Sequence, residues 1–251
     1  MKFMKTTTIL SIFTALFVAS VSAMDHSHAA FTAILKKTVN DVHVDYAALK
    51  GTPKPLDTYL DTLAEVGEAE FKKWSKKEQM AYLINLYNAS TLKLVADNYP
   101  VKSIKDIGGP IKSPWKMPVV RLFGKKQTLD YVEHEMLRPK YEDPRIHFAV
   151  NCASIGCPAL REEAFQASKL DTQLDEQGRA FLRDGSKNFL NAKTRTLHLS
   201  SIFDWFKTDF TSKSGSVQAF VRDYVNDADR AVIDKGGISI KYTDYDWGLN
   251  K

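Results

Sequence analysis

The chain has 251 residues, of which 44% are hydrophobic and 26% charged, with 35 Lys and Arg against 30 Asp and Glu. This composition excludes a disordered, collagen-like or low-complexity protein. Two cysteines are too few for a disulfide-dense miniature scaffold, and the length is sufficient to bury a full hydrophobic core.

Residues 1–23 have the organisation of a secretory signal peptide. Lys2 and Lys5 precede an apolar stretch over residues 9–19, and small residues follow up to Ala23. This stretch is too short to span a membrane, and no later segment of the sequence reaches that length. We therefore expect a periplasmic or secreted protein with no membrane span in the mature chain, in which residues 24–251 form a single domain.

The charge of the mature chain does not indicate nucleic-acid binding. Removal of the signal also removes two of the five excess positive charges. The remaining basic residues form no stripe with interleaved aromatic side chains, so nucleic acid is not an expected partner.

Hydrophobic periodicity predicts helices over residues 28–39, 55–66 and 76–98. Ser75 and Glu78 have the spacing of a capping box at the start of the third helix. The centre of this helix is apolar nearly all round, which predicts deep burial. Asn85 and Asn88 lie three residues apart within it, and buried amides need hydrogen-bond partners.

The rest of the chain predicts an α+β fold, with a mostly helical N-terminal half packed on a small sheet. Residues 101–118 are rich in turn residues and predict a loop, and Thr128 is the expected N-cap of a helix over residues 129–137. Strict alternation of apolar residues predicts a strand over residues 145–151. Further predicted strands are 119–123, 194–199 and 238–243, and further predicted helices are 158–166, 169–184, 202–210 and 216–234.

Both cysteines lie where the predicted strand 145–151 passes through a loop into the predicted helix 158–166. Pro158 suits the first helical position, which places Cys157 at the N-cap and Cys152 in the loop. A helix N-terminus lowers the pKa of a thiol, so a nucleophilic cysteine is one interpretation. In an exported protein a Cys152–Cys157 disulfide is the alternative, and a redox pair or metal ligation remain open.

Histidines and acids supply the candidate partners of such a cysteine. His147 lies on the predicted strand, and Glu133 and His134 lie on the predicted helix 129–137. A papain-like chain order is also present, because His198 and then Asp204 and Asp209 follow the cysteines. The sequence contains no Walker loop, G-x-G-x-x-G or H-E-x-x-H, so no motif predicts a cofactor or a metal.

Several segments resemble the family catalogued as domain of unknown function 547. They are residues 81–88, 133–138, 147–158, 201–210 and 245–250. The resemblance implies an exported bacterial protein of one domain and supplies no reaction. It places Asn88, Glu133, His134, His147, Cys152 and Cys157 on the polar motif positions of the family, and so implies that these residues converge on one site.

Two main functional hypotheses follow. In the first, the protein is a cysteine-centred hydrolase or acyl transferase, with Cys152 or Cys157 as nucleophile, His147 or His134 as base and Asn88 as an orienting or oxyanion group. In the second, it is a non-catalytic envelope protein in which the disulfide fixes the loop, and its partner is an unidentified small molecule or peptide. A third hypothesis is a zinc site built from His134, His147 and a cysteine.

Overall fold

The computed structural model describes residues 24–109 and 111–251. The predicted signal peptide lies outside the described residues and stays a prediction. Within the described residues, no helix is both long enough and apolar enough to cross a membrane. Helices predominate over short strands, so the predicted α+β class is confirmed.

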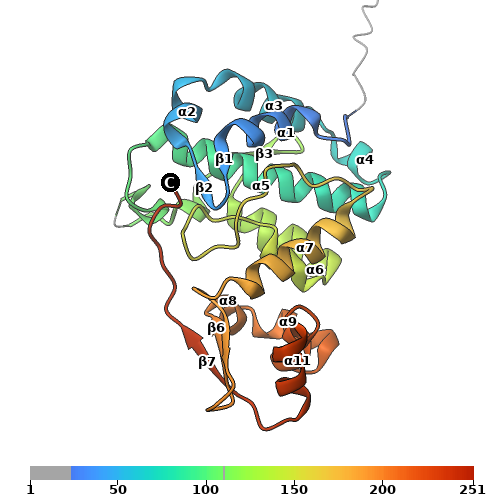
Figure 1. Cartoon of the computed structure of the whole chain (residues 1–251). Coiled ribbons are helices and arrows are strands. Elements are labelled where there is room, and N and C mark those ends of the chain that lie inside the picture. Colours follow the sequence, from blue (N-terminus) through green and yellow to red (C-terminus); the bar gives the residue numbers. More distant parts are fainter. Residues whose placement is uncertain (1–23, 110) are drawn as a thin grey trace, which may run out of the picture.

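The N-terminal half consists of helices around one buried helix, α5 (Figure 1). Its elements are α1 (Ala29–Thr38), β1 (Val39–Asn40), β2 (His43–Val44), α2 (Tyr46–Gly51), α3 (Lys54–Ala64), α4 (Glu68–Phe71) and α5 (Lys76–Asn98). The predicted capping box is confirmed, because Ser75 Oγ accepts from Glu78 N and Glu78 Oε2 accepts from Ser75 N. Every residue from 80 to 92 is buried, so α5 is the centre of the larger core.

The middle of the chain is irregular and holds short helical turns. Its elements are η1 (Ile104–Asp106), η2 (Pro114–Lys116), the hairpin strands β3 (Val120–Leu122) and β4 (Lys125–Gln127), the π-helix η3 (Tyr131–Leu137), α6 (Arg138–Tyr141) and the 3₁₀ helix η4 (Pro144–Phe148). The hairpin packs against α3 and α5. Thr128 caps the predicted helix as expected, since its Oγ1 accepts from Tyr131 N at 3.0 Å.

The predicted strand over residues 145–151 is wrong. Pro144 begins η4, and the Asp143 carboxylate accepts from Arg145 N at 3.0 Å, which caps the first turn. Ile146, His147 and Phe148 are all buried in succession, so the alternation does not separate an inner from an outer face. The segment lies where the two hydrophobic cores meet, and its residues 146–151 are all buried.

The predicted helix over residues 158–166 is also wrong. This segment is irregular, and the next helix begins only at Leu170. Pro158 therefore starts no helix, and Cys157 is not an N-cap. The argument that a helix N-terminus activates a cysteine loses its structural basis.

The C-terminal part forms a smaller unit around a second core (Figure 1). Its elements are α7 (Leu170–Arg183), β5 (Phe189–Asn191), β6 (Thr196–Ser200), α8 (Ile202–Trp205), α9 (Lys207–Ser214), α10 (Val217–Arg222), α11 (Asp227–Asp234) and β7 (Ser239–Thr243). In the three-stranded sheet, β6 lies between antiparallel β5 and parallel β7. The predicted helices 202–210 and 216–234 are each divided into two.

The irregular segment 149–166 is held by amide side chains of two helices. Asn88 of α5 donates to Ala149 O at 2.9 Å and accepts from Asn151 N at 2.9 Å. Asn85 makes the same pair of bonds to the backbone N and O of Phe165. From α7, Gln173 binds Ala164 O and Gln166 N, and Gln177 binds Phe148 O and Ala159 O. These bonds replace the ladder that a helix or strand would supply.

The C-terminal tail leaves β7 and returns to the larger unit, where the terminus lies close to β2 (Figure 1). Asn250 O accepts from Val44 N at 2.8 Å, and Asn250 Oδ1 accepts from the Tyr46 hydroxyl at 2.7 Å. Leu249 N donates to Lys102 O. The tail therefore connects the smaller unit back to the larger one.

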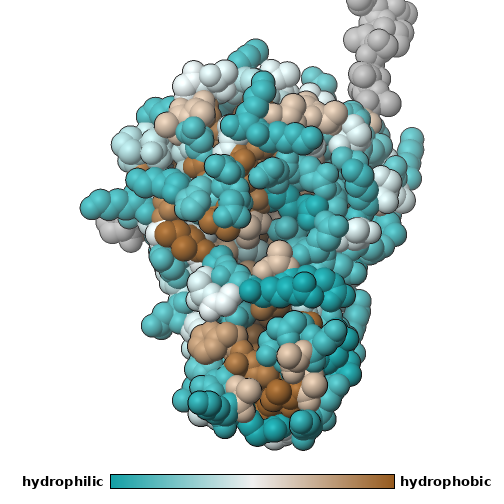
Figure 2. Space-filling model, viewed as in Figure 1, coloured by the Kyte–Doolittle hydropathy of each residue, from teal (hydrophilic) through white to brown (hydrophobic). Residues whose placement is uncertain are grey.

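The face seen in Figure 2 is mainly hydrophilic, with apolar residues visible in limited patches on both units.

The Asn88 amide gives a direct test of this arrangement. We expect Asn88→Ala to lower the free energy of unfolding by about 2–4 kcal/mol, because a buried carbonyl and a buried N–H both lose their partner. The matched control is Asn98→Ala on the same helix, where an exposed side chain makes one bond to Leu94 O. Urea unfolding measures both variants, and an equal loss in the two would contradict the role assigned to Asn88.

Candidate functional site

A cleft of about 190 Å³ lies where the two units meet. Five predicted site residues line it, namely Glu133, His134, His147, Cys152 and Cys157. The other lining residues are Tyr87, Trp115, Asp130, Val150, Pro158, Ile202, Trp205, Phe206, Tyr245 and Trp247. Asn88 is not among the described residues that line the cleft, and its amide acts on the backbone just before Cys152.

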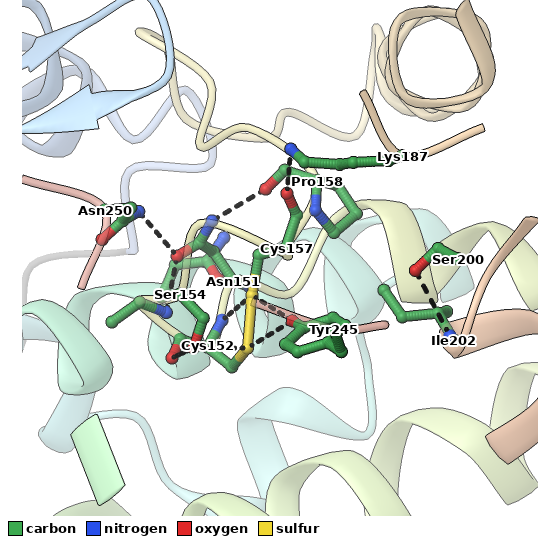
Figure 3. Close-up of a disulfide and its surroundings, with 12 residues drawn as sticks. Asn151, Cys152, Ser154, Cys157, Pro158, Lys187, Ser200, Ile202, Tyr245 and Asn250 are labelled. Carbon is green, nitrogen blue, oxygen red and sulfur yellow. Dashed lines mark hydrogen bonds between the residues drawn. A yellow bond between two sulfur atoms is a disulfide. The ribbon is translucent and has the colours of Figure 1, made fainter. Parts of the chain in front are cut away.

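The structure places the two cysteine sulfurs at disulfide-bonding distance (Figure 3). Their Cα atoms are 6.4 Å apart, within the range that a disulfide spans. The Tyr245 hydroxyl lies 3.1 Å from each sulfur, and Cys152 N donates to Cys157 Sγ at 3.0 Å. Cys157 is 4% exposed, whereas Cys152 is half-buried. Cys152 is therefore the more exposed residue of the two.

The C-terminal tail holds the cysteine loop from the other side. Ile155 N donates to Gly248 O and Gly156 N donates to Asp246 O, both at 2.8 Å. A Cβ atom at Gly156 would lie 2.9 Å from the Tyr245 ring. Only glycine permits so close an approach, so Gly156 allows Tyr245 to reach the sulfurs.

His147 binds the carboxylate of Asp209, a residue that the sequence suggested only as a possible acid in a papain-like chain order. His147 Nε2 lies 2.8 Å from Asp209 Oδ2, and its ring stacks on Phe206 with centroids 3.9 Å apart. His198, the histidine of that chain order, instead stacks on Phe189 and is not among the described residues lining the cleft. His147, and not His198, is therefore the histidine that pairs with Asp209.

Asp209 also binds Arg138, which connects it to the second histidine. Arg138 Nε and Nη2 donate to the two carboxylate oxygens at 2.6 and 3.0 Å, and Arg138 Nη1 lies 3.1 Å from His134 Nδ1. Burial raises the pKa of Asp209, but the hydrogen bonds from His147 and Arg138 outweigh it and hold the pKa well below its usual range. The two predicted histidines are thus joined through one ion pair.

Glu133 is the most buried carboxylate of the cleft, with 8% of its surface exposed. Burial raises the pKa of the Tyr87 hydroxyl, and the neighbouring Glu133 carboxylate raises it further. Glu133 and His134 are adjacent in sequence, yet both line the cleft, and they lie on the π-helix η3. π-Helical turns are rare and are frequent at functional sites.

Aromatic side chains form much of the cleft wall, and no motif in the sequence predicted an aromatic site. Trp247 packs on Trp115 and Trp205 with ring centroids 5.7 and 5.8 Å apart, and Lys105 Nζ lies 3.5 Å above the Trp247 ring. Trp205 is 49% exposed. The available signal was the presence of tryptophans in the short segments 201–210 and 245–250, which were noted only for their family resemblance.

The described residues contain no group of three or more His, Cys, Asp or Glu side chains arranged to hold a metal ion. The zinc hypothesis built on His134, His147 and a cysteine therefore has no matching donor set in residues 24–109 and 111–251. Both cysteine sulfurs are instead directed at one another.

Comparison with known proteins finds a match to a family model over part of the chain. Residues 71–182 match the model of the family described as "Protein of unknown function, DUF547", which confirms the resemblance. The match includes α5, the π-helix and the whole cysteine loop, and ends before Asp209 and Tyr245. No curated protein and no solved structure matches the chain.

Asp209 makes the site sensitive to pH. We expect Asp209→Asn to lower the free energy of unfolding at pH 7 by about 1–3 kcal/mol, because Arg138 and His147 lose a charged acceptor. The pKa of Asp209 is lower in the folded than in the unfolded chain, so this contribution is complete above the unfolded value and is lost as the pH falls below about 4.

Urea unfolding at pH 7, 4 and 2.5 measures this dependence. The difference between wild type and Asp209→Asn is expected to narrow at the lowest pH. Asp204→Asn, an exposed carboxylate on α8, is the control and should change stability little. A difference that is constant over the whole range would refute the assignment of Asp209.

Proposed function

We propose that the chain is an exported protein of the cell envelope, periplasmic or secreted, that binds a small molecule or a peptide in this cleft. In the proposal Cys152 and Cys157 form a disulfide in the cleft wall. The supporting observation is the position of the sulfurs, which lie at bonding distance and share the Tyr245 hydroxyl. A cysteine in a disulfide is not a thiolate nucleophile, so this geometry favours binding over hydrolysis.

The volume of the cleft limits what enters it. Pockets for drug-sized ligands are about 300–1,000 Å³, and a cavity of about 150 Å³ accommodates benzene. A cleft of about 190 Å³ therefore takes a group as large as one aromatic ring or one amino-acid side chain. The remainder of a larger ligand lies outside, against the exposed face of Trp205.

The charges of the lining indicate which groups fit. Asp130 and Glu133 line the cleft, and none of its described lining residues is a lysine or an arginine. The nearby Arg138 is committed to Asp209, and Lys105 lies on the Trp247 ring. Aromatic faces attract cations, so a neutral or cationic group is favoured over an anionic one.

A second candidate function is a cysteine-centred hydrolase or acyl transferase. The observation in its favour is that Cys152 and His147 line the same cleft, with His147 bound to Asp209. In this hypothesis a reduced Cys152 is the nucleophile, His147 is the general base and Asp209 orients the imidazole. The reaction requires a free thiol in the exported protein.

Thiol titration of the natively exported protein separates the two candidates. The binding hypothesis expects no thiol that reacts with Ellman's reagent in the unreduced protein, and two after reduction in denaturant. Mass spectrometry of the same envelope fraction should show a mature chain that begins at Met24. One fast-alkylated cysteine in the unreduced protein would instead support the hydrolase.

Single-ring probes test the binding hypothesis directly. Benzylamine, benzyl alcohol and benzoate have one ring each and are cationic, neutral and anionic at pH 7. We expect millimolar benzylamine and benzyl alcohol to shift the indole N–H NMR signals of Trp115, Trp205 and Trp247, and benzoate to bind at least several-fold more weakly.

Trp74 lies outside the cleft lining and serves as an internal control, since it packs on Phe71 and Tyr82. Its indole signal should not move. Tightest binding by benzoate, or shifts confined to Trp74, would refute the proposed cleft specificity.

A further inference from the structure

We propose that the Cys152–Cys157 disulfide is chemically reactive and that the cleft accepts a thiol, which exchanges with the disulfide at Cys152 Sγ. The inference deepens the proposed function and rests on it, since it names a thiol compound or a cysteine side chain of a peptide as the ligand class. It stands on three features of the site: unequal access to the two sulfurs, the donors around Cys157 Sγ, and the rigid support of those donors.

The first feature is access. Both cysteines line the cleft, but Cys157 is 4% exposed and Cys152 is half-buried. A thiolate attacks a disulfide at one sulfur and expels the other. A thiol that enters from the cleft therefore meets Cys152 Sγ, and Cys157 Sγ becomes the leaving group.

The second feature is the stabilisation of that leaving group. Cys157 Sγ accepts from Cys152 N at 3.0 Å and from the Tyr245 hydroxyl at 3.1 Å (Figure 3). The Lys187 ammonium donates to the carbonyl oxygen of the same cysteine at 2.9 Å. Hydrogen-bond donors stabilise a thiolate, and a better-stabilised thiolate leaves faster.

The third feature is the support of these donors. Asn88 and Asn151 bind the backbone on either side of Cys152, because Asn151 N donates to Asn88 Oδ1 and Ala153 N donates to Asn151 Oδ1. The Cys152 N–H is thus held in place by its neighbours. Tyr245 is fixed by its close approach to Gly156. Donors that are already in position need no reorganisation when charge develops on the sulfur.

The exchange proceeds in two steps. A ligand thiolate forms a bond to Cys152 Sγ while the bond between Cys152 and Cys157 breaks, and the electron pair leaves on Cys157 Sγ as a thiolate. A second ligand thiolate then attacks the ligand sulfur of this mixed disulfide and releases the Cys152 thiolate. Two ligand thiols are oxidised to one disulfide, and the protein disulfide is reduced by two electrons.

The experiment begins with the oxidised mature chain and reduced glutathione as the thiol. After timed incubation without denaturant, the samples are quenched with acid, alkylated and weighed by mass spectrometry. We expect the folded wild type to be reduced by millimolar glutathione. Tyr245→Phe should slow the reduction at least tenfold, because Cys157 Sγ loses its hydroxyl donor. The matched control Tyr242→Phe, an exposed tyrosine on β7, should react like the wild type.

Two single-cysteine variants test which of the two sulfurs is reachable from the cleft, on which the direction of attack depends. With oxidised glutathione, Cys157→Ser should form a mixed disulfide at Cys152 at least tenfold faster than Cys152→Ser forms one at Cys157. Thermal unfolding establishes that each variant is folded at the reaction temperature. Equal rates for the two variants would overturn the assignment of Cys152 as the attacked residue.

The wild-type measurement needs no variant and decides the inference by itself. A folded wild type whose disulfide survives excess glutathione for hours would overturn the inference and leave a structural disulfide. If the single-ring probes still bind in that case, the proposed binding function stands alone. Reduction by glutathione without probe binding would be the opposite outcome, in which the disulfide is reactive and the ring-sized ligand cleft is wrong.

Discussion

The hydrogen bonds between the amides of α5 and the backbone of residues 149–166 are the constraint on which the rest of the structure depends. This segment crosses the interior without a helix or strand of its own. Asn85 and Asn88 each offer one donor and one acceptor, which match the N–H and C=O groups of the facing backbone. An apolar side chain at either position would leave those groups unpaired, at a cost of about 1–3 kcal/mol each.

The site follows from where this segment runs. Ile146 belongs to the larger core and Phe148 to the smaller one, so His147 lies at the boundary between them. Across the boundary, Arg138 from the larger unit meets Asp209 from the smaller one. The cleft is therefore assembled from both units, and no single helix or strand carries it.

Local signals in the sequence predicted the regular elements well. The Ser75 and Glu78 capping box located the start of α5, and the apolar period predicted its burial. The segment 158–166 was predicted wrongly because its backbone partners are distant amides, which periodicity does not register. The segment 145–151 was predicted wrongly because Asp143 caps a 3₁₀ turn whose residues are buried in succession. The family resemblance implied that six polar residues converge on one site, and five of them line the cleft. Asp209 and Tyr245 could not be assigned their roles, because their contacts depend on partners 62 to 93 residues away in sequence.

The return of the C-terminal tail to the cysteine loop affects the order in which the site is completed. The cysteines are five residues apart, and such short loops close within tens of nanoseconds. The Tyr245 hydroxyl follows Cys152 by 93 residues. In a chain that emerges from its N-terminus, both thiols are therefore available for oxidation well before Tyr245 is present. The contact between Tyr245 and the sulfurs forms only after the tail has returned to the loop, so the surroundings of the cysteines are completed by the last residues of the chain.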